Sequence, residues 1–258
     1  MIMIGKVVVS LIWAFWMMAM SSVEGKPSDT DVIVPTLLEE EYNPTYSSTF
    51  DRVKKRGYVI CGTNDEFPGF SQESWNSEDG SRWEGFDVDI CRAVAAAMFG
   101  DANAIEFTIV NGRTRFEFLI DGSIDVLSAA TTFTYTRNVA KKLEFLPTTY
   151  YDGQGFIVRK TLGVSSAKQM EGARICFSGS GTAAKNIADF MELHGIKYIP
   201  VAVKPTEKTK NVYKRGDCDM YGTDRSGLAS NRLSFADPDR HMILPEIISK
   251  EPLGPVVK

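Results

Sequence analysis

The sequence predicts an α/β fold of two similar lobes joined by an extended segment. The main observation is two runs of alternating strand and helix patterns, at about 50–152 and 159–243. Short apolar strands that alternate with amphipathic helices are typical of a mostly parallel sheet with helices on both faces. The second observation is the glycine-punctuated stretch that separates the runs, residues 150–159. We therefore expect a hinge at residues 153–158.

The chain begins with the pattern of a secretory signal peptide. Lys6 precedes an apolar stretch, Val7 to Met20, and small residues at cleavage spacing follow it. As a helix this stretch would rise only about 21 Å, too short for a hydrocarbon core of about 30 Å. We expect residues 1–25 to be removed on export, and the alternative is a signal anchor that stays in the membrane. The first cysteine is Cys61, so a lipid anchor at the cleavage site is not expected, and a bacterial product of this kind would be periplasmic.

Residues 26–49 are rich in Pro, Ser, Thr and Glu without periodicity, which favours a flexible lead-in. The elements of the first lobe then follow from apolar periodicity and glycine stops. In the helix over 86–99 we expect Phe86, Ile90, Val94, Ala97 and Met98 to form the buried face. The predicted elements are a helix over 51–57, a strand over 58–62, a helix over 86–99, a strand over 105–110, a helix over 113–120 and a strand over 124–127.

The second lobe repeats this order after the extended segment. Residues 244–258 then form another extended piece. The predicted elements are a strand over 174–177, a helix over 183–194, a strand over 197–203, a helix over 207–214 and a strand over 220–223.

The four cysteines are expected to form disulfides, because the chain carries an export signal. Four cysteines allow three pairings, and pairing within each half is the simplest. This gives Cys61 with Cys91 and Cys176 with Cys218, whereas buried free thiols are the alternative.

Composition and missing motifs exclude several functions. The net charge is −4 and charged residues are interspersed without a basic block, so nucleic acid is not expected as a partner. The sequence shows no nucleophile elbow, zinc-ligand spacing or phosphate-binding Gly-Lys motif, and its two histidines lie apart. We therefore expect no catalytic residue, no metal and no cofactor.

Several ordered blocks resemble the third family of bacterial extracellular solute-binding proteins. Gly85 to Met98 matches that family's signature, and Thr134-Tyr-Thr-Arg137 resembles its next block. Within the family, residues 151–160 and 244–255 look like the general L-amino-acid-binding proteins of polar amino-acid ABC transporters. The resemblance implies a type II periplasmic-binding-protein fold whose two lobes close on a ligand. It also implies that residues 244–258 return toward lobe one, which would be incomplete at the C-terminus.

The resemblance implies a function in transport. We expect a monomer that binds a free L-amino acid, of broad and polar preference, and presents it to the membrane permease of an ABC importer. One alternative is an enzyme on the same fold, similar to cyclohexadienyl (arogenate or prephenate) dehydratases. Another is a truncated remnant without function.

Two charged residues are candidates for the charges of an amino acid. Arg137 offers a planar pair of donors for a carboxylate, and the resemblance implies that Thr132 assists it. Asp224 follows the strand over 220–223, where open α/β sheets place ligands, and the resemblance implies that it pairs with the ammonium. The alternatives are an exposed surface arginine and an aspartate that caps the next helix.

Two further regions complete the expected site. Gly181 and Thr182 precede the helix over 183–194, and backbone N–H groups at a helix start favour a carboxylate, although Thr is also a common helix cap. Phe67 matches an aromatic position that covers the ligand in the family. Ala130 and Arg225 stand where relatives commonly have asparagine and glutamine, so the ligand preference is left open.

Overall fold

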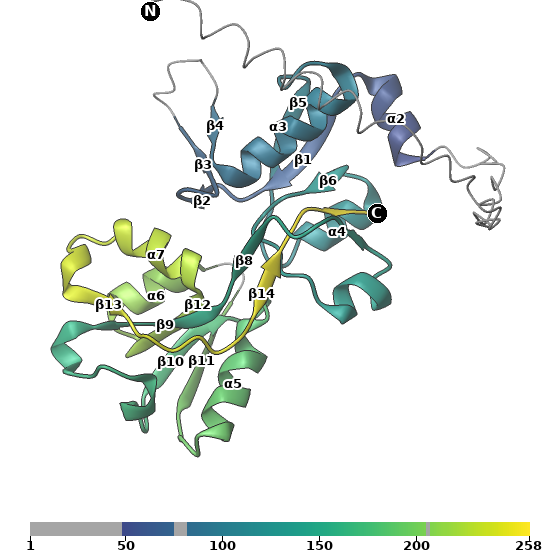
Figure 1. The fold of residues 1–258 in the computed structure, drawn as a ribbon. Helices are drawn as coiled ribbons and strands as arrows, with labels where there is room; N and C mark the ends of the chain where they lie inside the picture. Colours follow the sequence, from purple (N-terminus) through teal and green to yellow (C-terminus); the bar gives the residue numbers. More distant parts are fainter. Residues whose placement is uncertain (1–47, 75–81, 205–206) are drawn as a thin grey trace, which may run out of the picture. The chain divides into compact units, whose positions relative to one another are not determined.

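The computed structural model describes residues 48–74, 82–204 and 207–258, which lie in one compact unit of the chain. The expected signal peptide and most of the lead-in lie outside the described residues. Within the described ranges, no helix combines the length and the apolar character needed to cross a membrane. The polypeptide forms two five-stranded sheets, each with its own helices and two buried clusters (Figure 1).

The first sheet has the strand order β5-β1-β6-β15-β7. Strand β1 pairs in parallel with β5 and β6, whereas β15, from the end of the chain, pairs antiparallel with β6 and β7. Its strands are β1 (Val59–Thr63), β5 (Ile105–Ile109), β6 (Val126–Leu127), β7 (Glu144–Phe145) and β15 (Val256–Val257). Its helices are α2 (Thr49–Arg56), α3 (Phe86–Phe99) and α4 (Arg115–Asp121), with a π-helical turn at Thr136–Ala140. A small antiparallel sheet precedes α3 and comprises β2 (Glu66–Phe67), β3 (Ser71–Glu73) and β4 (Trp83–Glu84).

Helix α3 confirms the predicted bounds but not the predicted face. It runs from Phe86 to Phe99 and ends at Gly100, which adopts a left-handed φ of 73°. Its buried residues are Asp87, Val88, Cys91 and Ala95, whereas Phe86 is 37% exposed. The predicted face was wrong by about one position. The burial of the Asp87 carboxylate, which hydropathy does not score as core, and the disulfide of Cys91 set the rotation of the helix.

The second sheet has the order β11-β10-β12-β9-β13. Strand β10 pairs in parallel with β11 and β12, while β9 pairs antiparallel with β12 and β13. Its strands are β9 (Gln154–Arg159), β10 (Arg174–Ser178), β11 (Ile199–Val203), β12 (Met220–Asp224) and β13 (His241–Ile243). Its helices are α5 (Ala183–Leu193), α6 (Thr209–Arg215) and α7 (Arg225–Leu233), with 3-10 turns at Lys160–Leu162, Ala167–Gln169 and Pro238–Arg240. The strands confirm the predicted β-α order of this half.

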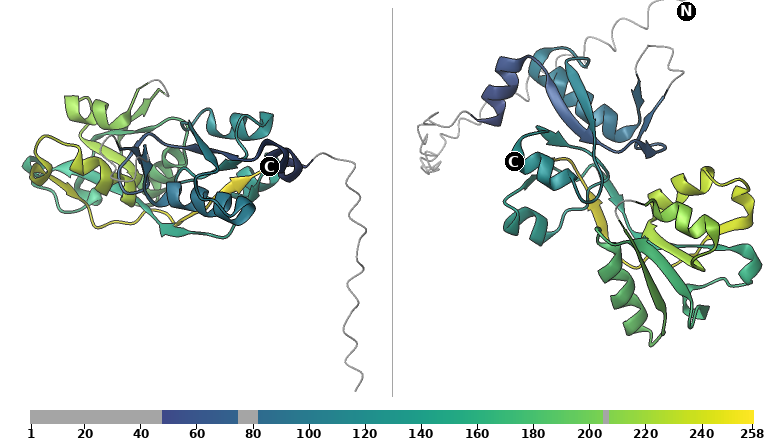
Figure 2. Two further views of the ribbon diagram at one scale, coloured as in Figure 1. Left: turned by 90° about the horizontal axis from the view of Figure 1, so that it is seen from above. Right: turned by 180° about the vertical axis from the view of Figure 1, so that it is seen from behind.

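Two strands carry the chain between the sheets. Strand β8 (Tyr150–Asp152) pairs antiparallel with β14 (Glu251–Leu253), and the two lie side by side in Figure 1 and in the view from behind in Figure 2. In the segment expected to act as the hinge, residues 154–158 form the buried part of strand β9. The apolar run that follows Gly153 and Gly155 is long enough to enter the second sheet as a strand.

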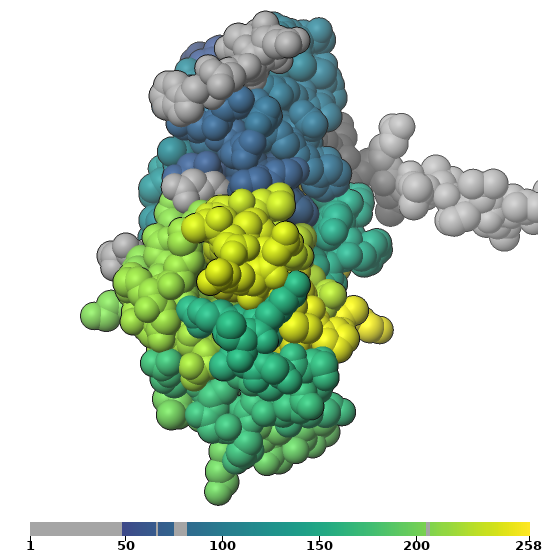
Figure 3. Space-filling view, turned by 90° about the vertical axis from the view of Figure 1, so that its left-hand side faces the viewer, coloured from purple at the N-terminus to yellow at the C-terminus, as the bar shows by residue number. Residues whose placement is uncertain are grey.

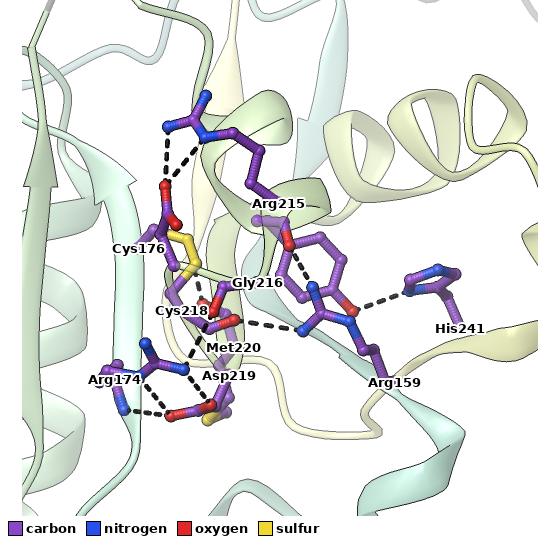
Figure 4. The surroundings of a disulfide bond; sticks show 11 residues. Arg159, Arg174, Cys176, Arg215, Gly216, Cys218, Asp219, Met220 and His241 are labelled. Carbon is purple, nitrogen blue, oxygen red and sulfur yellow. Dashed lines mark hydrogen bonds and ion pairs between the residues drawn. A yellow bond between two sulfur atoms is a disulfide. The ribbon is translucent and has the colours of Figure 1, made fainter.

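The structure contains the two disulfides that the simplest pairing predicts. Cys61 is joined to Cys91 with Cα atoms 6.2 Å apart, and Cys176 to Cys218 with Cα atoms 5.7 Å apart. Beside the second bridge, Arg159 lies over the ring of Tyr213 and donates to the carbonyl oxygen of Cys218 (Figure 4). The bridge and this arginine fasten the loop before β12 to the sheet.

Candidate functional site

Elements of both sheets line one cavity of about 300 Å³, a size at the lower end of the range for small-molecule sites. All six residues that the sequence singled out for ligand binding lie in its wall. The first-sheet side contributes Asn64, Asp65, Phe67, Gly112, Arg115, Ala129, Ala130, Thr132 and Arg137. The second-sheet side contributes Gln154, Ser178, Ser180, Gly181, Thr182, Ala183, Lys208, Thr209, Lys210, Tyr221, Thr223, Asp224, Gly227 and Asn231.

Arg137 enters the cavity from the turn after β6. Its side chain is 8% exposed, and its Nη1 donates to the carbonyl oxygen of Thr132 at 2.6 Å. Its guanidinium carbon lies 5.2 Å from the centre of the Phe116 ring, which adds a cation–π contact. Burial lowers the pKa of Arg137, while Glu251 and Asp224 oppose that change. The arginine is thus held in one position with donors left for an anion.

A buried carboxylate fixes the loop that leads to Thr132 and Arg137. Asp87 accepts a hydrogen bond from the Ser128 hydroxyl at 2.7 Å and another from the backbone N–H of Ala130 at 2.8 Å. Burial raises the pKa of Asp87 to about 6, and the two hydrogen bonds oppose this. The first turn of α3 therefore sets the path of the cavity wall.

Gly181 and Thr182 lie where α5 begins. No side chain caps this helix start, because the Thr182 hydroxyl is used elsewhere. It accepts from Gln154 Nε2 at 2.7 Å and donates to Glu251 Oε2 at 3.3 Å. The start of α5 consequently faces the cavity with its positive end, which favours an anion.

Asp224 ends β12 and comes directly before α7. Its Oδ1 accepts from Gln154 Nε2 at 2.9 Å. Burial raises the pKa of Asp224 to about 7; the Gln154 hydrogen bond lowers it, whereas Glu251 and Asp152 raise it further. A cation bound beside this carboxylate would restore its ordinary ionisation.

Gln154, Asn186 and Glu251 form a hydrogen-bond network behind Asp224 that sequence reasoning missed. Asn186 Nδ2 donates to Gln154 Oε1 at 2.9 Å and to Glu251 Oε1 at 2.8 Å. Glu251 is 2% exposed and also accepts from Ser249. These residues lie up to 97 positions apart in the sequence, so no local pattern connects them. The signal that could have indicated the network was Gln154, a polar residue between two glycines. Their contacts couple Asp224 to β14.

Phe67 covers the cavity from β2. Its ring stacks on Phe70 with ring centres 4.6 Å apart. Gly227 of α7 faces this ring, since a Cβ atom on the glycine would lie 3.6 Å from Phe67 Cζ. Figure 3 shows this side of the molecule, where the yellow-green surface of α7 adjoins the blue surface around β2. Lys208 Nζ and Asp65 Oδ2, 3.8 Å apart, add a second contact at the rim.

Arg115, the first residue of α4, is a second arginine in the cavity wall that sequence reasoning missed. Its position after a short loop gave no signal, because an arginine in a first helical turn is usually a surface residue. Arg225, noted in the sequence, instead donates from Nη1 to the carbonyl oxygen of Leu244 at 2.8 Å. In the ranges that the structure describes, no group of three or more His, Cys, Asp or Glu residues is arranged to hold a metal ion.

The order of the sheets and a two-sided cavity with opposite charges define the class of protein. The chain belongs to the bacterial extracellular solute-binding proteins, family 3, whose model matches residues 59–231. It is 46% identical over 212 residues to the "General L-amino acid-binding periplasmic protein AapJ" of Rhizobium johnstonii, covering 82% of this chain and 61% of that protein. It is 45% identical to the "Glutamate/glutamine/aspartate/asparagine-binding protein BztA" of Rhodobacter capsulatus, covering 82% of this chain and 62% of that protein.

A solved structure supports the same assignment. The chain resembles an ABC transporter periplasmic binding protein from Brucella ovis with glutathione bound, with a TM-score of 0.77 and 42% identity over 83% of this chain and 66% of that chain. The two-lobed α/β fold predicted from the sequence is thereby confirmed. This chain spans about three fifths of the length of the two curated relatives.

Proposed function

We propose that this protein binds a free L-amino acid in the cavity and presents it to the permease of an ABC importer. The observation that carries the proposal is the presence of Arg137 and Asp224 in the wall of one cavity. An amino acid carries a carboxylate and an ammonium about two bonds apart, so a site with one buried cation and one partly buried anion matches both charges. The names of the AapJ and BztA relatives support this class of ligand.

In this proposal Arg137 and the start of α5 receive the α-carboxylate, with Thr132, Gly181 and Thr182 beside it. Asp224 receives the α-ammonium and Phe67 covers the bound molecule. Because the residues come from both sheets, a bound zwitterion favours the arrangement in which the sheets approach each other. Strands β8 and β14 are then the segments about which the two halves move.

We propose that the site binds its ligand without catalysing a reaction. The relatives are named as binding proteins, and Gln154 holds the Asp224 carboxylate in a hydrogen bond. We further propose that the protein is a monomer, is exported by the signal peptide at residues 1–25 and acts in the periplasm. Mass spectrometry of the exported protein, expressed in a Gram-negative host, tests the cleavage site.

Calorimetric titration with the twenty L-amino acids and with glutathione tests the binding. For the tightest ligand, two analogues then test the two charges: the 2-oxo acid, which lacks the ammonium, and the decarboxylated amine. Each is expected to bind more weakly by about 2–5 kcal/mol, because one buried charge is left without its partner. Binding of both analogues as tightly as the parent would contradict the assignment of Arg137 and Asp224. Consumption of prephenate or arogenate, followed by NMR, would favour the dehydratase alternative.

A further inference from the structure

Strands β8 and β14, which cross between the sheets, form a short ladder whose two ends contact different halves of the protein (Figure 1). The ladder consists of three pairs of residues, with Tyr150 opposite Leu253, Tyr151 opposite Pro252 and Asp152 opposite Glu251. Both strands must bend where the two halves move relative to each other. The contacts that each pair makes outside the ladder therefore decide with which sheet that pair moves.

The pair Tyr150–Leu253 is attached to the half that contains the first sheet. The ring of Tyr150 packs edge-to-face against the ring of Phe70, with ring centres 5.2 Å apart. Leu253 forms a β-bridge with Thr132. Phe70 lies between β2 and β3, and Thr132 follows β6. Because both contacts belong to the first half, this end of the ladder moves with the first sheet.

The pair Asp152–Glu251 is attached to the half that contains the second sheet. The Asp152 carboxylate accepts a hydrogen bond from the backbone N–H of Ser226, in the first turn of α7, at 3.3 Å, and another from the Ser226 hydroxyl. Glu251 accepts from Asn186 Nδ2 at 2.8 Å and from the Thr182 hydroxyl at 3.3 Å, both at the beginning of α5. This end of the ladder therefore moves with the second sheet and its helices.

Tyr151 and Pro252 form the pair between these two ends. The Tyr151 side chain is 82% exposed, so it contributes little packing to either half. The carbonyl oxygen of Pro252 accepts a hydrogen bond from the backbone N–H of Phe133 at 2.8 Å, so a rotation in β14 must occur before this carbonyl group. Hinges are commonly a few residues at the ends of such elements. The ladder thus passes from one half to the other at this pair.

Glu251 is the more firmly held of the two residues that attach the ladder to the second sheet. Its side chain is 2% exposed, and a buried carboxylate is unfavourable unless hydrogen bonds satisfy it. Thr182 and Asn186 supply such bonds from the start of α5, where the helix dipole also favours an anion. Separation of Glu251 from α5 would leave much of a buried charge unsatisfied. Strand β14 therefore follows α5 up to this residue.

We propose that the two sheets turn about the Tyr151–Pro252 pair and that Glu251 is the positioning residue that fixes β14 to the start of α5. This inference rests on the proposed function, since closure over an amino acid is the movement that the pivot serves. Glu251 does not touch the ligand. It acts through Thr182, because it holds the start of α5 in one orientation as the cavity closes toward Arg137.

Distances between spin labels on introduced cysteines test the proposal, because all four native cysteines are in disulfides. The labels replace three exposed residues: Arg113 before α4, Lys185 in α5 and Lys250 next to Glu251. Without added amino acid, the distribution of Lys250–Lys185 distances is expected to be narrow. The probe is an equimolar mixture of the twenty L-amino acids. It is expected to shorten the Arg113–Lys185 distance and to leave the Lys250–Lys185 distance unchanged.

Two substitutions of Glu251 separate its hydrogen bonds from its volume. Glu251→Leu is expected to broaden the Lys250–Lys185 distribution, with or without the probe, and to weaken binding of the probe about tenfold. Glu251→Gln is expected to keep the narrow distribution, because the amide oxygen still accepts from Asn186. Asn186→Ala removes the donor instead and is expected to broaden the distribution as well, which keeps the test decisive if leucine at position 251 prevents folding.

Glu144→Leu is the matched control, because it makes the same substitution at an exposed position of the first sheet, and it is expected to change neither distance. If the probe shortens the Lys250–Lys185 distance, the pivot lies before residue 250 and the inference is overturned. A narrow distribution in both Glu251→Leu and Asn186→Ala would overturn the role of Glu251. If the variants behave as expected but the probe changes no distance, the attachment by Glu251 is upheld and the proposed function fails.

Discussion

The carboxylate of Asp87 accepts a hydrogen bond from the backbone N–H of Ala130 at 2.8 Å. Ala130 has a φ of 43°, in the left-handed region that residues with a Cβ atom rarely adopt. The buried aspartate thus keeps an unfavourable backbone conformation at the point where the chain leaves β6 and turns toward Thr132 and Arg137. The geometry of the candidate carboxylate site depends on this contact between distant parts of the sequence.

Ala130→Gly is expected to raise the free energy of unfolding by about 0.5–1 kcal/mol, because glycine adopts a positive φ without the Cβ clash. Ala97→Gly is the control. Ala97 is exposed within α3, where glycine is expected to lower stability by about 1 kcal/mol. Urea unfolding of both variants checks the opposite signs. A loss of stability in Ala130→Gly equal to that in Ala97→Gly would show that Ala130 is not strained.

Arg137→Lys is expected to weaken amino-acid binding by about 2–5 kcal/mol, because lysine keeps the charge but not the planar pair of donors. The variant also loses the hydrogen bond from Nη1 to the carbonyl oxygen of Thr132. Titration calorimetry measures the change, with Arg240→Lys, an exposed position, as the control. Affinity within a factor of two of the unmodified protein would remove Arg137 from the site.

Amino-acid affinity is expected to rise with pH up to about 7 and then level off. Burial raises the pKa of Asp224 to about 7 in the empty site, with Glu251 and Asp152 adding and Gln154 and Arg115 opposing. A bound ammonium lowers that pKa, so binding below pH 7 must release the proton of Asp224.

Calorimetry in two buffers of different ionisation enthalpy measures this release. At pH 6 about nine tenths of a proton per ligand is expected, and almost none at pH 8.5. Proton release of the same size at both pH values would place the titrating group elsewhere. The same shift predicts that Asp224 contributes less to folding as pH rises from 4 to 7, because its folded-state pKa lies above its unfolded value.

Gln154→Leu is expected to weaken binding about tenfold and to move the pH midpoint of binding upward. Gln154 donates to both Asp224 and Thr182, and its hydrogen bond lowers the pKa of Asp224. Leucine has a similar volume but offers no donor, so Asp224 would become harder to ionise. The pH profile of the dissociation constant separates this effect from simple loss of packing. An unchanged midpoint would mean that Gln154 does not tune Asp224.

Replacing Cys176 and Cys218 together by serine is expected to destabilise the protein by about 4 kcal/mol. The bridge joins residues 42 positions apart, and the unfolded chain gains the freedom of that loop when the bridge is absent. Both sulfur positions are fully buried, so two unpaired hydroxyl groups add to the cost. Denaturant unfolding under non-reducing conditions measures the difference, and a change below about 1 kcal/mol would contradict a structural role for this bridge.

Local sequence patterns were sufficient to predict the helices and strands that are marked by flanking glycines or by short apolar runs. The helix at 86–99 was predicted to the residue because glycines flank it, and the strands near 59–63 and 174–178 because short β-branched and apolar runs follow turns. Arg137 and Asp224 were found because their charges suit those of an amino acid and because the resemblance to the solute-binding family implies ligand contacts at these two positions. The rotation of α3 was not predictable, since Asp87 is buried only through its contacts with Ser128 and Ala130.

The sequence by itself determined the two α/β halves, the disulfide pairing within each half and six residues that line one cavity. The two halves follow from local periodicity and the disulfide pairing from cysteine position. The six cavity residues follow from charge, from the chemistry of a helix start and from the resemblance to the solute-binding family. Only the tertiary structure decided that Gln154, Asn186 and Glu251 form one network, that Arg115 lies beside Arg137 over Phe116, and that β8 and β14 connect the sheets. These contacts join residues far apart in the chain, and their energies come from burial and from hydrogen bonds that exist only once both sheets have formed.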